Sequence, residues 1–314
     1  MSDIDLLPEK LLRALAPWRQ APRWLVGFSG GLDSSVLLHL LAQLAREHAL
    51  PPLLAVHVDH QLQAVSASWQ KHCQRVCAAL NVDLVCIAVD VEKKSRVSPE
   101  DAARKARYAA FAAQMQPDDV LLLAHHIDDQ AETFLLRALR GAGVPGLASM
   151  SLSRAFAGGM VVRPLLDIDR AALEQHAMAQ HIEYVSDPSN DAIAFDRNFL
   201  RHEILSRLRH RWPSVTGRFN AAAQHMAEAN VLLRERARED IECCNVDQRW
   251  GAPTIELAPL LALSPERQRN VVALWIFDRS DIEVAAFLGI WPSNVRATRH
   301  HAIATLREKL RHCA

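Results

Sequence analysis

Four short apolar stretches recur along the first half of the chain. Each has the length of one strand and is rich in Val, Leu or Ile. They span residues 24–28, 53–58, 84–89 and 120–124. Near-continuous apolar runs of this length are typical of strands that are buried on both faces of a sheet. A further stretch, residues 161–166, is expected to add a fifth strand.

The segments between these stretches have a different period. Apolar residues recur there at steps of three and four residues, which is typical of helices packed on one face. The predicted helices span 34–45, 64–80 and 99–114. Strands that alternate with helices predict βαβ units, and hence an α/β fold with a doubly wound parallel sheet.

The pattern changes at about residue 190. No further strand is predicted after it, and residues 198–240 are helical in pattern and rich in Ala, Leu, Arg and Glu. The dipeptide Trp212-Pro213 interrupts that pattern. We therefore expect a smaller all-α domain to follow the domain that contains the sheet.

The composition narrows the classes of function. Half of the 314 residues are hydrophobic, so the chain can bury a sizeable core. Its 36 basic and 36 acidic residues exclude a uniformly basic coat for nucleic acid, so any such contact must be local. The absence of a long apolar run or signal-peptide core predicts no membrane contact. Six cysteines without a CxxC pair argue against a disulfide scaffold or zinc ribbon and favour a cytoplasmic protein.

A loop with two glycines follows the first strand and opens the first helix. It consists of Ser29, Gly30, Gly31, Leu32, Asp33 and Ser34. Glycines let the backbone approach phosphate oxygens, and the N–H groups at a helix N-terminus face such an anion. The two serine hydroxyls add donors, and Asp33 is placed to cap the helix or to hold Mg²⁺. An ordinary strand-to-helix turn is the alternative, and the glycines alone do not decide between the two.

A group of acids follows the fourth strand, at the edge where open α/β sheets bind ligands. It consists of Asp128, Asp129 and Glu132, with His126 just before it. Asp128 and Glu132 share one helix face because they are four residues apart. Such carboxylates suit a metal ion or an ammonium group, and the histidine suits proton transfer. Acids placed at a helix N-terminus because of its dipole are the alternative, which explains one or two of them but less easily the whole run.

These two motifs resemble those of one enzyme family. SGGLDSS resembles the PP-loop of the ATP pyrophosphatase superfamily, and HHIDDQAET resembles the corresponding motif of tRNA(Ile)-lysidine synthetases. Other segments are similar to the same family. They lie at residues 57–60, 100–108, 141–147, 163–166, 187–190 and 196–201.

The resemblance implies a defined reaction. ATP adenylates O2 of the wobble cytidine in an isoleucine tRNA with a CAU anticodon, and the amine of free L-lysine then displaces AMP from C2. ATP and Mg²⁺ are the implied cofactors, with residues 29–34 on ATP and with Asp33 and Asp129 on Mg²⁺. The implied catalytic residues are Asp33, His126, Asp128, Asp129 and Glu132.

A tRNA partner requires local positive charge. Residues 197–218 carry six arginines against a single acid. This run of arginines favours contact with RNA. The segment at 100–108 that resembles the family contributes two further arginines. The candidates for tRNA binding are Arg104, Arg107, Arg197, Arg201 and Arg207. The alternative is a solvated helix face on which about half of the arginines pair with acids elsewhere.

The resemblance to lysidine synthetases ends at about residue 277. Residues 278–314 resemble the helix-turn-helix of sigma-factor region 4, but a helical pair that binds no DNA is the favoured interpretation. We expect residues 1–213 to form the ATP-binding catalytic domain and 214–277 a tRNA-binding helical domain that is truncated relative to the family. Two alternatives stay open: a DNA-binding regulator whose PP-loop domain senses a nucleotide, and a PP-loop enzyme that modifies another tRNA base.

Overall fold

A computed structural model describes most of the chain. It covers residues 6–61, 66–90, 99–188, 192–244, 247–249, 252–254 and 256–277. The chain divides into two compact units, Met1–Gln224 and His225–Ala314. The predicted tail at 278–314 lies outside the described residues, and the predicted domain boundaries at 213 and 277 stay predictions. No helix in the described ranges is long and apolar enough to cross a membrane.

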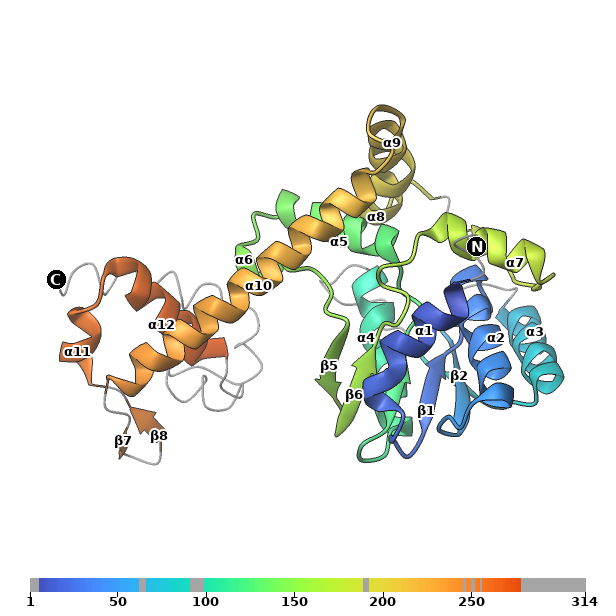
Figure 1. The fold of residues 1–314 in the computed structure, drawn as a ribbon, viewed down its shortest axis with the longest axis horizontal. Coiled ribbons are helices and arrows are strands. Elements are labelled where there is room, and N and C mark those ends of the chain that lie inside the picture. The colour runs from blue at the N-terminus through green and yellow to red at the C-terminus, as the bar shows by residue number, and fades with distance from the viewer. Residues whose placement is uncertain are drawn as a thin grey trace. The chain divides into compact units, whose positions relative to one another are not determined.

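The first unit is built around one six-stranded sheet (Figure 1). Its strands are β1 (Trp24–Gly27), β2 (Leu53–Asp59), β3 (Asp83–Ala88), β4 (Val120–Leu122), β5 (Ser153–Phe156) and β6 (Gly159–Val162). Their order across the sheet is β3-β2-β1-β4-β6-β5. All neighbouring pairs are parallel except β5 with β6. The predicted doubly wound parallel sheet is therefore confirmed.

The edge of the sheet differs from the prediction. The stretch expected as a fifth strand over 161–166 forms a strand only up to Val162, the last residue of β6. Pro164 follows closely and has no N–H group to donate to a neighbouring strand. The antiparallel strand β5 was not predicted. Its two middle residues are exposed and its two ends are half-buried, so it lacks the continuous apolar run that marks β1 to β4.

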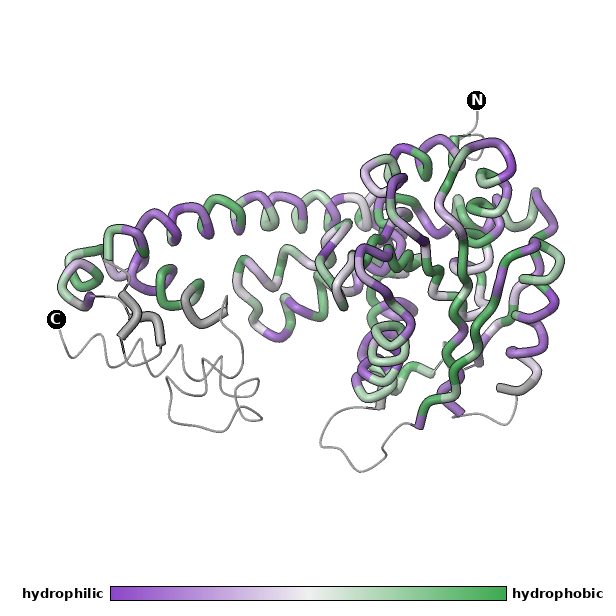
Figure 2. Tube along the Cα trace, turned by 90° about the horizontal axis from the view of Figure 1, so that it is seen from below, coloured by the Kyte–Doolittle hydropathy of each residue, from purple (hydrophilic) through white to green (hydrophobic). Residues whose placement is uncertain are grey.

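Helices follow each parallel strand of the sheet or precede it. In the first unit they are α1 (Leu7–Leu15), η1 (Ala16–Trp18), α2 (Leu32–Glu47), α3 (Ser66–Leu80), α4 (Pro99–Gln114), α5 (Ile127–Leu139), α6 (Val144–Leu147), α7 (Arg170–Ala179), α8 (Asp196–Phe199), the π-helical turn η3 (Leu200–Leu205) and α9 (Ser206–Arg211). The long helix α10 (Val215–Glu242) begins in the first unit and continues into the second. Hydrophilic and hydrophobic stretches alternate along it (Figure 2).

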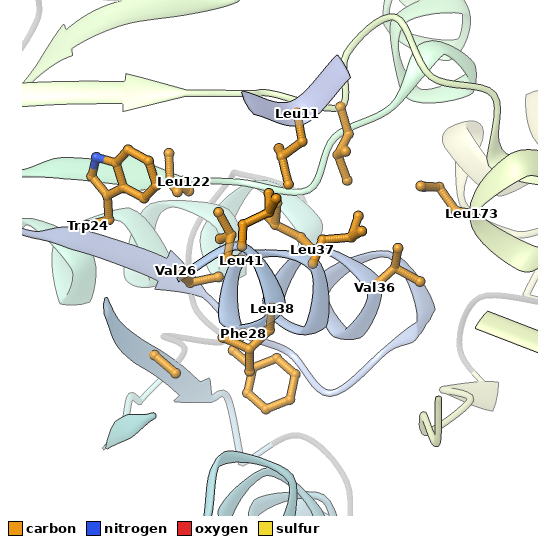
Figure 3. Packing of buried hydrophobic residues seen from close by; sticks show 14 of the residues in the cluster. Leu11, Trp24, Val26, Phe28, Val36, Leu37, Leu38, Leu41, Leu122 and Leu173 are labelled. Atoms are coloured by element: carbon orange, nitrogen blue, oxygen red, sulfur yellow. The ribbon is translucent and has the colours of Figure 1, made fainter. Parts of the chain in front are cut away.

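Successive residues of each strand serve two separate cores, because side chains alternate between the faces of a sheet. Trp24 and Val26 belong to the cluster formed with α1, α2, α3 and α7, whereas Leu25 belongs to the cluster with Phe111 of α4. Figure 3 shows Leu37 and Leu41 of α2 packed beside Val26 of β1. Both faces are therefore covered, which explains why these strands read as unbroken apolar runs.

The described part of the second unit is mostly helical but also contains a hairpin. It holds the remainder of α10, α11 (Leu257–Leu261) and α12 (Pro265–Phe277). Arg267 of α12 forms an ion pair with the buried Asp240 of α10. The antiparallel strands β7 (Asp247–Arg249) and β8 (Ala252–Thr254) correct the expectation that no strand follows residue 190. Each has three residues and no apolar alternation, so the sequence pattern could not reveal it.

The main core predicts a clear contrast in stability. Leu37 is fully buried, whereas Leu139 is 74% exposed. Leu37→Ala is expected to lower the free energy of unfolding by about 3 kcal/mol, since it removes buried apolar surface and leaves a cavity. Leu139→Ala is expected to lower it by under about 0.5 kcal/mol. Urea unfolding followed by circular dichroism measures both, and equal losses in the two variants would contradict this assignment of the core.

Candidate functional site

The order of the strands reverses between β1 and β4. The chain runs from β1 outward to β2 and β3 on one side, and it returns to place β4 on the other side of β1. At such a point the loops that follow the two strands diverge, and the crevice between them is the usual ligand site of open α/β sheets. Here the crevice lies between the loop after β1, which leads into α2, and the loop after β4, which leads into α5.

The loop after β1 has the geometry of an anion cradle. Gly30 takes a positive φ of 81°, which an L side chain rarely adopts. The hydroxyls of Ser29 and Ser34 lie 3.0 Å apart, and the Ser29 N–H donates to the Ser34 hydroxyl at 3.2 Å. Helix α2 begins at Leu32 with Gly31 as its N-cap, so no side chain caps the N–H groups of its first turn. Those groups are thus available to an anion.

Side chains packed behind this loop hold it in place. A Cβ atom on Gly30 would lie 3.0 Å from the Sγ atom of Cys73 in α3. The N–H of Val185 donates to the Gly30 carbonyl at 2.9 Å, and the buried His57 donates through Nδ1 to the Phe28 carbonyl at the same distance. Burial raises the pKa of the Cys73 thiol to about 12, so this cysteine serves packing and not nucleophilic chemistry.

The loop after β4 places a buried histidine between acids from both loops. The side chain of His126 is 1% exposed. Its Nε2 atom lies 3.6 Å from the Oδ2 atom of Asp33 and 3.5 Å from the Oδ2 atom of Asp129, and its Nδ1 atom lies 3.7 Å from the Oδ2 atom of Asp128. Asp33 comes from α2, whereas the other two acids come from α5. The histidine therefore connects the two sides of the crevice.

The charges of this group depend on one another. Burial alone would lower the pKa of His126, but the carboxylates of Asp129, Asp33 and Asp128 together raise it. Burial alone would likewise raise the pKa of Asp129, but His126 and Arg197 hold it well below its usual range. The pair therefore favours a charged imidazolium beside a charged carboxylate. The backbone N–H of His126 also donates to the Oδ2 atom of Asp129 at 3.1 Å.

Two arginines cover the acids on the next turn of α5. Arg197 donates to Glu132 at 2.6 Å and to Asp129 at 3.0 Å. Arg201 donates to Glu132 at 2.6 Å and to Asp129 at 3.4 Å. The Glu132 side chain is fully buried. The two arginines are four residues apart, which places both on one helix face. Both can therefore donate to the same two carboxylates.

The third acid has partners that were not predicted. Asp128 forms an ion pair with Arg209 of α9 and accepts the backbone N–H of Arg170, the first residue of α7, at 3.2 Å. The sequence run 197–218 had indicated Arg209 as basic but had not connected it with α5. The sequence could show only that Arg209 is charged. It could not show its pairing with Asp128, because 81 residues separate the two.

The arginines predicted to bind tRNA lie in different environments. Arg197 and Arg201 pair with the acids of α5. The alternative interpretation of residues 197–218 had expected about half of their arginines to pair with acids in this way. Arg207 is exposed and pairs with Glu203 at 3.2 Å. The guanidinium of Arg104 lies over the ring of Tyr108 in the same helix, 5.0 Å from its centre. Arg107 lies half-buried on that helix. The structure therefore divides the five candidates between α4 and the region from α8 to α9.

The donor set fits a cation that shares its ligands with a phosphate. Within the described residues no group of three or more His, Cys, Asp or Glu side chains is arranged to hold a metal ion. The Oδ1 atom of Asp33, however, is buried and has no hydrogen-bond partner. Mg²⁺ needs only one or two protein carboxylates when phosphate oxygens and water complete its octahedron. Asp33, with Asp129 across His126, satisfies that requirement.

Comparisons with known proteins agree with this geometry. The family described as "PP-loop domain" matches residues 6–208. The tRNA(Ile)-lysidine synthase of Pseudomonas syringae pv. tomato is 50% identical over 273 residues, which are 86% of this chain and 61% of that protein. The namesake from Coxiella burnetii is 41% identical over 270 residues, covering 86% of this chain and 59% of that protein. The chain thus spans about three fifths of the length of these relatives.

A solved structure supports the fold. A U34-tRNA thiolase from Methanococcus maripaludis superposes with a TM-score of 0.60, covering 72% of this chain and 78% of that one. The two sequences are 14% identical, so this likeness concerns the arrangement of strands and helices.

The loop after β1 predicts a difference between two glycines. Gly30→Ala and Gly158→Ala both place a side chain at φ near 80°, which costs about 1 kcal/mol in backbone strain. Gly158 faces open space, whereas the new Cβ at Gly30 meets Cys73. We expect Gly30→Ala to lower the free energy of unfolding by roughly 1–3 kcal/mol more than Gly158→Ala, as in other overpacked sites. Denaturant unfolding measures this, and equal losses would show that the loop has room to relax.

A second expectation concerns His125 and pH. Burial lowers the pKa of His125 from 6.5 to about 3, with Arg163 and Arg197 acting in the same direction and Asp129 against it. The folded state therefore resists a proton that the unfolded state accepts, and this residue destabilises the fold progressively as pH falls below about 6.5. His125→Asn should lose less stability than the wild type between about pH 7 and about pH 5. The exposed His48→Asn serves as control and should follow the wild type.

Proposed function

The chain belongs to the PP-loop domain family, and from this premise we propose that it is a tRNA(Ile)-lysidine synthase. In this proposal it uses ATP to join L-lysine to C2 of the wobble cytidine of an isoleucine tRNA with a CAU anticodon. The observation that carries the proposal is His126, buried between Asp33 of the phosphate loop and Asp129 of α5. It joins the two motifs within one crevice, and curated lysidine synthases are similar to this chain over that whole region.

ATP is proposed to bind with its phosphates on residues 29–34. The uncapped N–H groups at the start of α2 and the hydroxyls of Ser29 and Ser34 face the anion. O2 of the cytosine attacks the α-phosphorus, the new oxygen–phosphorus bond forms, and pyrophosphate leaves with the electron pair of the broken bond. The loop stabilises the charge that develops on the leaving group, which is the role that preorganised N–H groups serve in phosphoryl chemistry. Mg²⁺ held by Asp33 and Asp129 would supply further charge neutralisation when it is bound.

The acids of α5 are proposed to receive the amino group of lysine. The ε-amine attacks C2 of the adenylated base, the carbon–oxygen bond to AMP breaks, and the amine loses a proton to a nearby base. Asp128, Asp129 and Glu132 are the available carboxylates, and His126 links them to the phosphate loop. Because Arg197, Arg201 and Arg209 occupy these carboxylates in the structure, an ammonium group has to compete with a guanidinium for its place.

The tRNA is proposed to approach over two surfaces. Arg104 and Arg107 of α4 and the exposed Arg207 of α9 would contact its phosphates. Residues 214–277 would form a helical tRNA-binding domain, which follows the catalytic domain at 1–213 in the sequence. Arg197 and Arg201 would join them on release from the acids. The target cytidine has to leave its stack to reach the crevice, as bases do in other modifying enzymes. We place this reaction in the cytoplasm.

Lysine transfer tests the proposal. Purified protein is incubated with ATP, Mg²⁺, labelled lysine and an isoleucine tRNA transcript bearing CAU, and a methionine tRNA with the same anticodon is the control. We expect label in the isoleucine tRNA alone. A folded protein that binds ATP and both tRNAs but labels neither would refute the proposed function.

A matched pair of variants tests the assigned site. Asp129→Asn is expected to lower lysine transfer by roughly 100-fold or more, since it removes a carboxylate from the reacting centre and one of the two acids that pair with Arg197 and Arg201. Asp83→Asn makes the same chemical change at an exposed position, at the amino end of β3 and away from the crevice. It should retain the rate of the wild type. Near-normal turnover of Asp129→Asn would remove this residue from the mechanism.

A further inference from the structure

A second charged cluster lies around Tyr108 of α4, and its sign is opposite to that of the acids in α5. The ring of Tyr108 has the guanidinium of Arg104 at 5.0 Å and that of Arg154 at 5.3 Å from its centre. Phe156 of β5 packs edge-on against the same ring at 5.5 Å. Arg163, just after β6, and Arg137 of α5 complete the group. Helix α4 and the hairpin of β5 and β6 therefore lie side by side (Figure 1).

None of these four arginines has a carboxylate partner among the described residues. Arg163 donates to the Ser151 carbonyl at 2.7 Å, and Arg137 donates to the carbonyls of Gly146 and Ser149 at 2.8 and 2.9 Å. Arg104 lies over the ring of Tyr108, and Arg154 lies over the rings of Tyr108 and Phe156. These partners satisfy hydrogen bonds or packing but leave four positive charges without neutralisation. Elsewhere in the unit, the half-buried Arg197 and Arg201 are paired with acids.

An uncompensated group of cations of this kind is unfavourable unless an anion joins it. Arg163 is 2% exposed, and its Nε atom is buried without a hydrogen-bond partner in the described part of the chain. Burial lowers the pKa of Arg163, and Arg154 and Arg104 act in the same direction, whereas Tyr108 acts against them. Burial would raise the pKa of the Tyr108 hydroxyl, but Arg104, Arg163 and Arg154 lower it instead, which shows that the hydroxyl lies in a strongly positive field.

The cluster lies at the same edge of the sheet as the crevice. Arg163 directly follows β6, which pairs in parallel with β4, and His125 lies three residues after the end of β4. The charges of both groups act on the pKa of His125, which Asp129 raises and Arg163 lowers. A substrate in the crevice therefore has carboxylates on one side and unneutralised guanidinium groups on the other.

We propose that Arg104, Arg154 and Arg163, with the Tyr108 hydroxyl, form an oxyanion site for a substrate at the edge of the crevice. The ligand is an anionic group with two or more acceptor oxygens, since guanidinium groups bind such groups through paired N–H donors. Under the proposed function, on which this identification of the ligand rests, two sources offer that chemistry. They are a backbone phosphate of the tRNA and the α-carboxylate of free lysine.

Charge-removing variants test the site without requiring catalysis. Arg154→Gln and Arg104→Gln alter side chains that do not donate to the Ser151 and Ser149 carbonyls, so the hydrogen bonds of Arg163 and Arg137 to those carbonyls stay intact. Arg46→Gln is the matched control, because it removes one exposed charge at the far end of α2. Circular dichroism confirms that each variant is folded. An Arg154→Lys variant keeps the charge but loses the paired donors.

The first arm measures binding of an anticodon stem-loop RNA by fluorescence anisotropy over a range of salt. If the anion is a phosphate, each Gln variant should bind roughly tenfold more weakly and lower the slope of log K against log salt by about 0.7–1. Arg154→Lys should recover the slope but not the full affinity. Arg46→Gln should match the wild type.

The second arm measures binding of lysine and of lysinamide by calorimetry. If the anion is the carboxylate, the wild type should prefer lysine, and the Gln variants should lose that preference while RNA affinity is unchanged. Gln variants that match Arg46→Gln in both arms would overturn the proposal. A wild type that shows the site in either arm yet transfers no lysine would refute the proposed function and leave the anion site standing.

Discussion

The arrangement of this protein depends on the reversal of strand order between β1 and β4. Because the two strands are neighbours and parallel, their carboxyl ends release two loops into one crevice. One loop starts α2 with uncapped N–H groups, and the other starts α5 with acids. His126 fills the space between them, where its charge is stabilised by Asp33 on one side and Asp129 on the other. The loop at 29–34 and the acids of α5 thus lie in one crevice, which is where we propose that the reaction takes place.

Charge in this chain is separated locally although it cancels overall. The acids of α5 form ion pairs with arginines of α8, η3 and α9, and these ion pairs neutralise the acidic group. All three arginines come from helices that follow the sheet in the sequence. On the α4 side, the arginines around Tyr108 have carbonyls and rings for partners in place of acids. A net charge of zero therefore does not argue against RNA binding. RNA binding would then depend on a few arginines. In the free protein, some of these arginines are paired with acids, and the others carry charge that no acid neutralises.

Much of this architecture could be predicted from sequence because its signals are local. Unbroken apolar runs marked the four strands β1 to β4, and the loop at 29–34 and the acids at 128–132 followed two of them. The edge strand β5 and the hairpin of β7 and β8 escaped, since short strands with exposed positions lack such a pattern. The pairing of Arg201 with Glu132 also escaped, because 69 residues separate them and only the fold brings them together. Arg163 was predicted to be part of a strand. In the structure it lies directly after β6 and belongs to the charged cluster around Tyr108.

The central claim is that this crevice activates an RNA base with ATP before lysine attacks it. The most direct measurement uses ATP labelled at the α-phosphate, together with the isoleucine tRNA and no lysine. The account predicts that label becomes attached to the RNA as pyrophosphate is released in equal amount, and that added lysine then releases the label as AMP. Formation of ADP and phosphate, or release of pyrophosphate that does not require the RNA, would contradict it.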